Sequence, residues 1–139
     1  MTENHIMQMQ AGEVNAIRAI ADGDQDRPLL MLNINRYTAE SGYPDGEHYT
    51  TYIKVMQQTV SRVGGKVLWR TQVHGQPIGC DHDRADEILA IWYPSHHEFR
   101  SLRLAQGAKE MFERRQQCVA NAVLHRCPGD QLPLRPEAS

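Results

Sequence analysis

The sequence predicts an α+β protein with one antiparallel sheet and helices packed on one side of it. Apolar residues recur with a period of two in residues 28–36 and with a helical period in residues 49–63. Runs rich in β-branched, aromatic and other apolar residues at 66–73 and 87–93 predict two further strands. A second helical pattern and a last candidate strand follow. The order strand, helix, strand, strand, helix, strand is that of a ferredoxin-like βαββαβ fold.

The first predicted strand, residues 28–36, has two different faces. One face is apolar and the other turns polar toward its end; they consist of Leu30, Leu32 and Ile34, and of Leu29, Met31, Asn33 and Asn35. We expect helices to pack on the apolar face, and Asn33 and Asn35 to point into a cavity. The alternative is that both amides face water on a half-exposed sheet.

The segments before residue 28 and after residue 127 are predicted to be additions to the folded domain. Apolar residues at helical spacing predict a short amphipathic helix at residues 12–21, within an N-terminal extension that spans residues 1–27. The α+β barrel domain then covers residues 28–127. Residues 128–139 are rich in proline and are expected to form a flexible tail.

One continuous apolar stripe at residues 49–63 predicts a helix that begins near Asp45. The turn sequence P-D-G precedes it, and we expect Asp45 to cap its first turn. Gly64 and Gly65 supply the stop signal. The stripe, which we expect to pack mainly in the core, consists of Tyr49, Tyr52, Ile53, Met56, Val60 and Val63.

The second half of the chain holds a strand, an interrupted helix and one ambiguous segment. Residues 87–93 are apolar on both faces and are therefore predicted to form a central strand. Ser95 then stands as an N-cap with Glu98 three residues later, the pattern of a capping box. Gly107 interrupts this helix, which then resumes. Residues 120–127 either end the helix or form the fourth, edge strand.

Composition excludes several classes of protein. The 139 residues suit a single domain, and the net charge of −2 with scattered lysines and arginines argues against nucleic acid as a partner. No run approaches the roughly 20 apolar residues that cross a bilayer, so we expect no membrane association and a cytoplasmic location. The three cysteines form no C-x-x-C and are expected to be reduced. The seven histidines lack metal-site spacing, and we expect no metal or other cofactor.

The sheet face away from the helices is also apolar. It would present Trp69, Ile88, Ala90 and Trp92. An apolar face of this size has to be buried, and pairing with a second copy about a two-fold axis is the least elaborate way to do so. The sequence therefore predicts a homodimer.

Several segments together resemble a known family. They read L-M-L-N-I-N-R, Y-P-D-G, Y-T-T-Y, R-V-G-G-K-V-L-W-R and D-E-I-L-A-I-W-Y-P-S-x-x-E-F, and they run from Pro28 to Cys127. The sequence resembles domain-of-unknown-function family thirteen-thirty, of the dimeric α+β barrel superfamily. The resemblance implies a ferredoxin-like protomer, a homodimer whose two sheets form a barrel, and a cavity for a small, often flat organic molecule. It implies no particular reaction.

Few polar residues are placed to reach such a cavity. His74 is the candidate acid or base, because imidazole titrates near neutral pH and the residue follows a strand; the alternative is a solvated turn histidine. Asn33 and Asn35 are candidate catalytic groups that would hold an enolate or carboxylate oxygen. His96 and His97 are expected to be solvated. Candidate substrate-binding residues are Arg36, Tyr37, Tyr49, Tyr52, Trp69, Arg70 and Trp92.

Two functions from different classes follow. The first is a small cofactor-independent enzyme, of the isomerase, cyclase or monooxygenase type, acting on a small aromatic or polyketide-like metabolite. The second is a non-catalytic dimer that binds a small ligand or a partner. Catalysis requires a titratable group inside the cavity with its pKa perturbed, whereas simple binding does not.

Overall fold

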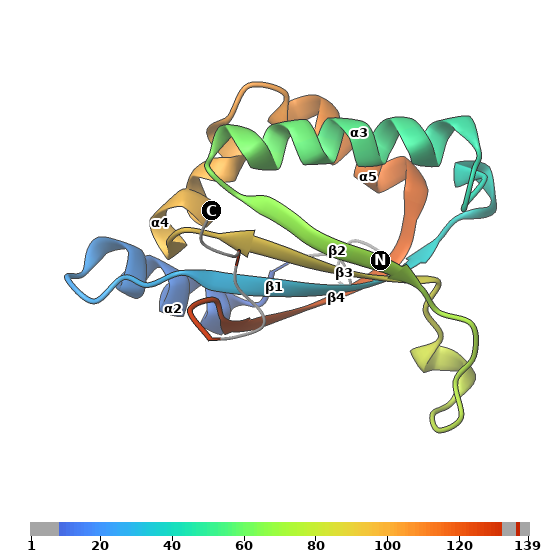
Figure 1. Cartoon of the computed structure of the whole chain (residues 1–139), viewed down its shortest axis with the longest axis horizontal. Helices are drawn as coiled ribbons and strands as arrows, with labels where there is room; N and C mark the ends of the chain where they lie inside the picture. The colour runs from blue at the N-terminus through green and yellow to red at the C-terminus, as the bar shows by residue number, and fades with distance from the viewer. Residues whose placement is uncertain (1–8, 132–135, 137–139) are drawn as a thin grey trace.

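The structure is a computed structural model that describes residues 9–131 and 136. These residues form one four-stranded antiparallel sheet with the strand order β2-β3-β1-β4. Helices α3 and α5 lie along one side of the sheet, as Figure 1 shows. This arrangement confirms the predicted ferredoxin-like βαββαβ fold. The helices and strands are α2 (Ala11–Asp22), β1 (Leu29–Tyr37), α3 (Glu47–Arg62), β2 (Lys66–Gln72), β3 (Glu87–Tyr93), α4 (His96–Ser101), α5 (Ala108–Cys118) and β4 (Val119–Pro128).

Helix α3 packs its predicted stripe against the sheet. Tyr49, Tyr52 and Met56 are each 4% exposed. The expected cap at Asp45 is wrong: the chain reaches the helix through Gly46, which is the N-cap in an extended conformation and has no side chain to donate or accept. Gly64, with a φ of 79°, ends the helix in the left-handed region that favours glycine.

The helices cover the sheet face that carries the two asparagines. Leu29 and Met31 on β1 belong to the same buried cluster as Leu89 on β3, and Asn33 lies directly opposite Leu89. The expectation that helices cover Leu30, Leu32 and Ile34 is therefore wrong. Both faces of β1 begin with apolar residues, so its alternation separates the faces without revealing which one the helices cover. We call the side of the sheet opposite α3 and α5 the outer face.

A β-bulge in β2 decides which of its side chains point toward the helices. Val67 lies opposite Ile91, but Trp69 lies opposite Ala90, so Leu68 is an extra residue in the ladder. After the bulge, each side chain of β2 points to the face opposite the one that regular alternation from Val67 would give it. Trp69 consequently lies on the outer face, and Arg70 lies on the helix-covered face.

The ends of the described chain are attached to the domain. Ile17 of α2 is 4% exposed within the core cluster, and α2 packs against α4. Strand β4 resolves the ambiguity of residues 120–127 in favour of an edge strand. Beyond it, the Trp92 indole donates to the Gly129 carbonyl at 2.8 Å. Most of the expected flexible tail, residues 132–135 and 137–139, lies outside the described residues.

Candidate functional site

A carboxylate is buried at the end of the sheet where β3 begins. Glu87 is 3% exposed, and its cross-strand neighbours are Asn35 on β1 and Gln72 on β2. An ionised group so far from water is tolerated only when hydrogen-bond donors surround it.

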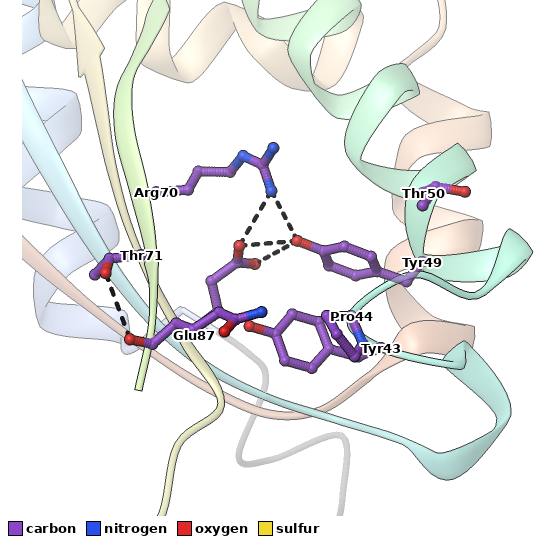
Figure 2. Close-up of a pocket in the computed structure, with 8 residues that line it drawn as sticks. Tyr43, Pro44, Tyr49, Thr50, Arg70, Thr71 and Glu87 are labelled. Carbon is purple, nitrogen blue, oxygen red and sulfur yellow. Dashed lines mark hydrogen bonds and ion pairs between the residues drawn. The ribbon is translucent and has the colours of Figure 1, made fainter. Parts of the chain in front are cut away.

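Three side chains supply those donors. The Tyr37 hydroxyl donates to Glu87 Oε1 at 2.5 Å, and the Tyr49 hydroxyl lies 2.9 and 2.8 Å from the two carboxylate oxygens. Arg70 Nη1 donates both to Glu87 Oε2 at 3.1 Å and to Tyr49 Oη at 2.8 Å (Figure 2). Glu87, Tyr49 and Arg70 thus form a closed triangle of charge-assisted hydrogen bonds.

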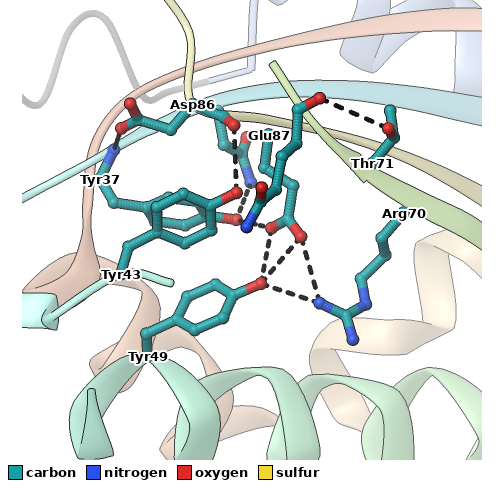
Figure 3. A network of polar contacts seen from close by, with 9 residues as sticks. Tyr37, Tyr43, Tyr49, Arg70, Thr71, Asp86 and Glu87 are labelled. Atoms are coloured by element: carbon teal, nitrogen blue, oxygen red, sulfur yellow. Dashed lines mark hydrogen bonds and ion pairs between the residues drawn. The ribbon is translucent and has the colours of Figure 1, made fainter. Parts of the chain in front are cut away.

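A second layer holds the tyrosines in position. Asn35 Nδ2 donates to Tyr37 Oη at 3.3 Å. Tyr43 stacks on the Tyr37 ring with centroids 4.8 Å apart, and its hydroxyl donates to the Asp86 backbone carbonyl at 3.1 Å. The Asp86 carboxylate in turn accepts the Tyr37 backbone N–H at 2.8 Å. Figure 3 shows side chains from β1, the loop before α3, α3 and β2 gathered around Asp86 and Glu87.

The surroundings keep both tyrosine hydroxyls protonated. Burial, and then the hydrogen bond to Glu87, raise the pKa of Tyr49 well above its ordinary value, and the same two causes raise that of Tyr37 further. Both groups are therefore neutral donors at physiological pH. They stabilise a negative charge on Glu87.

This triangle forms part of the wall of a pocket of about 400 Å³ (Figure 2). The volume suits a small organic molecule. Among the lining residues, only Arg70 has a basic side chain and only Glu87 has an acidic one. The lining residues are Tyr43, Pro44, Tyr49, Thr50, Arg70, Thr71, Gln72 and Glu87.

Comparison with known proteins gives structural neighbours only. No family model and no curated protein matches the chain. The chain is similar to the crystal structure of methylated RPA0582 protein, with 26% identity, a TM-score of 0.72 and coverage of 91% of this chain and 96% of that chain. A second match is RPA0582 from Rhodopseudomonas palustris, a protein of unknown function, with 25% identity, a TM-score of 0.71 and coverage of 89% and 96%. These neighbours share the fold.

The structure brings four of the candidate residues together. Tyr37, Tyr49 and Arg70 contact Glu87, and Asn35 contacts it through Tyr37. Asn33 also points to the helix-covered side. Within the described part of the chain, the side-chain oxygens of Asn33 and Asn35 are buried and accept no hydrogen bond.

The other candidates lie elsewhere. Arg36 and Trp92 belong to the outer face with Trp69, and Tyr52 is in the core, where burial raises its pKa to about 12. His74 is exposed in the loop after β2 and is not among the residues that line the pocket. The catalytic and binding roles expected of these residues stay predictions.

Two features of the structure were missed by sequence reasoning. Glu87 begins an otherwise apolar predicted strand, and this single carboxylate is the signal that the sequence offers. His96 was expected to be solvated, and this is wrong: it is 5% exposed, and its Nδ1 lies 2.9 Å from the Arg27 carbonyl and 3.1 Å from Asp26 Oδ1.

The described residues contain neither a metal-ligand cluster nor a membrane-spanning helix. Among them, no three histidine, cysteine, aspartate or glutamate side chains are grouped so that they could hold a metal ion. The same residues contain no helix with both the length and the apolar character required to span a bilayer.

Proposed function

We propose that the protein is a cofactor-independent enzyme that moves a proton on a small aromatic or polyketide-like metabolite, in a reaction of the isomerase, cyclase or monooxygenase type. One observation supports this proposal most strongly. Glu87 is buried but is joined by the Tyr49 hydroxyl to a pocket of about 400 Å³. A base withdrawn from solvent and connected to a cavity is typical of an acid–base site.

The proposed step is a proton relay. A substrate enol or phenol in the pocket donates its O–H proton to Tyr49 Oη while Tyr49 passes its own proton to Glu87. The two transfers are concerted, because the raised pKa of Tyr49 disfavours a free tyrosinate. Arg70, which already donates to Tyr49 Oη at 2.8 Å, stabilises the substrate anion that remains.

The experiment uses the enol form of phenylpyruvate as the probe. Its ketonisation removes the enol proton and adds a proton from water to carbon, and the loss of ultraviolet absorbance follows the rate. Glu87→Gln retains the shape and an acceptor oxygen but cannot take the proton, so we expect the catalysed rate to fall by roughly 100-fold or more. Glu47→Gln, the same change at an exposed position of α3, is the matched control. Equal rates in wild type and Glu87→Gln would reject the proposal.

A second candidate function is non-catalytic binding. It is favoured by the fact that Glu87 already accepts hydrogen bonds from Tyr37, Tyr49 and Arg70, so that the carboxylate is satisfied without a substrate. In that case the protein binds phenylpyruvate without accelerating its ketonisation. Binding measured by calorimetry together with the rate separates the two candidates.

A homodimer in the cytoplasm, serving small-molecule biosynthesis, is part of the same proposal. The outer face supports it: Trp69 is 42% exposed and Val123 is 40% exposed on a sheet face that also carries Leu32 and Ile34. The three unpaired cysteines fit a reducing compartment. Sedimentation equilibrium is expected to give twice the chain mass, and a folded monomer at micromolar concentration would exclude the barrel dimer.

A further inference from the structure

The guanidinium group of Arg70 is only partly used by the protein. A guanidinium carries five N–H groups. Nη1 donates to Glu87 Oε2 and to Tyr49 Oη, and within the described residues no acceptor contacts Nε or Nη2. The side chain of Arg70 is 36% exposed, whereas that of Glu87 is 4% exposed. Arg70 therefore extends from the buried carboxylate to the open part of the pocket.

The free edge of the Arg70 guanidinium favours an anion. The charge of Glu87 is offset by the donors of Tyr37, Tyr49 and Arg70, while the remaining edge of Arg70 faces no acidic group among the lining residues. That edge presents parallel N–H groups, the geometry that binds a carboxylate through two hydrogen bonds. A single cation suits a monoanion better than a doubly charged phosphate.

We propose that the substrates are 2-oxo carboxylic acids in their enol form, with the carboxylate held by Nε and Nη2 of Arg70. This inference rests on the proposed function. The enol oxygen of such a molecule is on the carbon next to the carboxylate. Because Nη1 of the same guanidinium contacts Tyr49 Oη at 2.8 Å, a carboxylate on Arg70 brings the enol O–H to the start of the relay. Arg70 is then the residue that selects the substrate and aligns it.

The β-bulge at Leu68 is what makes this arrangement available. With regular alternation after Val67, Arg70 would lie on the outer face, away from Glu87. The extra residue turns Arg70 to the helix-covered face, where its contacts with Glu87 and Tyr49 form. Bulges that redirect one side chain in this way are common beside active sites.

The test compares acids with their neutral esters. Binding is measured by calorimetry with 3-phenylpropanoate and its methyl ester, and turnover with the enols of phenylpyruvate and methyl phenylpyruvate. We expect wild type to prefer the acid by roughly tenfold to 100-fold in both measurements, the worth of a charged hydrogen-bonded contact. Arg70→Gln should abolish this preference, while Arg103→Gln, at an exposed position in a short 3₁₀ helix outside the pocket, should leave it unchanged.

The outcomes separate this inference from the proposed function. Equal affinity for acid and ester, or a preference that survives Arg70→Gln, overturns the carboxylate inference whatever the rate of turnover. A preference for the acid that Arg70→Gln abolishes, without any ketonisation by wild type, supports the carboxylate site and rejects the proposed enzyme. Because the preference is a ratio within each variant, a general loss of folded protein does not change it, and thermal unfolding followed by circular dichroism checks the fold of each variant.

Discussion

Two clusters of buried ionisable groups lie at opposite ends of β3, and the one around Glu87 lines the pocket described above. Glu87 is the first residue of the strand and meets Tyr49 and Arg70 in the pocket wall. His96 begins α4 just beyond the other end of the strand and is 5% exposed. Both clusters have groups withdrawn from water, so burial alone does not distinguish a functional site.

The His96 cluster is satisfied by the fold itself. Asp26 accepts the backbone N–H groups of His96 at 2.8 Å and of His97 at 3.1 Å, which caps α4. His96 Nδ1 donates to the Arg27 carbonyl, and its Nε2 faces Arg126 Nη1 at 3.4 Å. Arg126 in turn binds Glu13 of α2 through two hydrogen bonds of 2.7 and 3.1 Å. These contacts connect α2, α4 and β4.

The two clusters differ in the direction of their hydrogen-bonding groups. In the His96 cluster the donors and acceptors are directed at other parts of the chain, and the cluster joins three elements. In the Glu87 cluster, Arg70 keeps N–H groups on the pocket side. A polar cluster that fixes the fold has its groups turned inward, and one that serves a ligand leaves some directed at a cavity.

The largest effect on stability is expected from Glu87→Ala. The substitution leaves the buried Tyr37 hydroxyl without its acceptor and Arg70 without its counter-ion, although Arg70 can still reach water. We expect the free energy of unfolding to fall by about 2 to 3 kcal/mol, and by less than about 1 kcal/mol for Glu87→Gln, which keeps an acceptor. Urea denaturation gives both values. Equal losses would show that the carboxylate accepts no important hydrogen bond.

A smaller effect on stability is expected from Asp26→Ala, in the His96 cluster. The acceptor of the His96 and His97 backbone N–H groups at the start of α4 is lost, so the free energy of unfolding should fall by about 1 to 2 kcal/mol. Ketonisation of phenylpyruvate should keep its wild-type rate, because Asp26 lies at the far end of the sheet from the pocket. A loss of turnover in folded Asp26→Ala would break the distinction between the two clusters.

The smallest expected effect is on the pH dependence of stability, and it comes from Asp26 in the His96 cluster. Burial of Asp26 tends to raise its pKa, but the N–H groups of His96, His97 and Arg27 outweigh burial and hold it below the ordinary value of 3.8. A lowered folded-state pKa contributes stability above pH 3.8 that is lost as the pH falls through the folded-state value. Asp26→Asn should therefore lose less stability than wild type below that pH, by under about 1 kcal/mol. Urea denaturation at a series of pH values measures both proteins, and an equal loss of unfolding free energy below pH 3.8 would contradict this prediction.

Sequence patterns predicted the order of the elements up to the last strand, because the apolar runs and their turn and stop signals are clear there, whereas residues 120–127 were ambiguous. The strand at Glu87–Tyr93 and the N-cap at Ser95 were predicted correctly for this reason. The covered face of β1 was predicted wrongly, because that choice depends on long-range packing. The site was predicted only in part: Tyr49 and Arg70 were candidates, but the bulge that turns Arg70 toward Glu87 has no local signature in the sequence.

The most direct test of the proton relay compares Tyr49→Phe with Tyr43→Phe. Both tyrosines line the pocket and both substitutions retain the ring, but only the Tyr49 hydroxyl contacts Glu87, whereas that of Tyr43 donates to the Asp86 backbone carbonyl. We expect Tyr49→Phe to lower the rate of phenylpyruvate ketonisation by roughly 100-fold or more and Tyr43→Phe to lower it by less than about tenfold. Equal rates for the two variants would contradict the assignment of the relay to Tyr49 and Glu87.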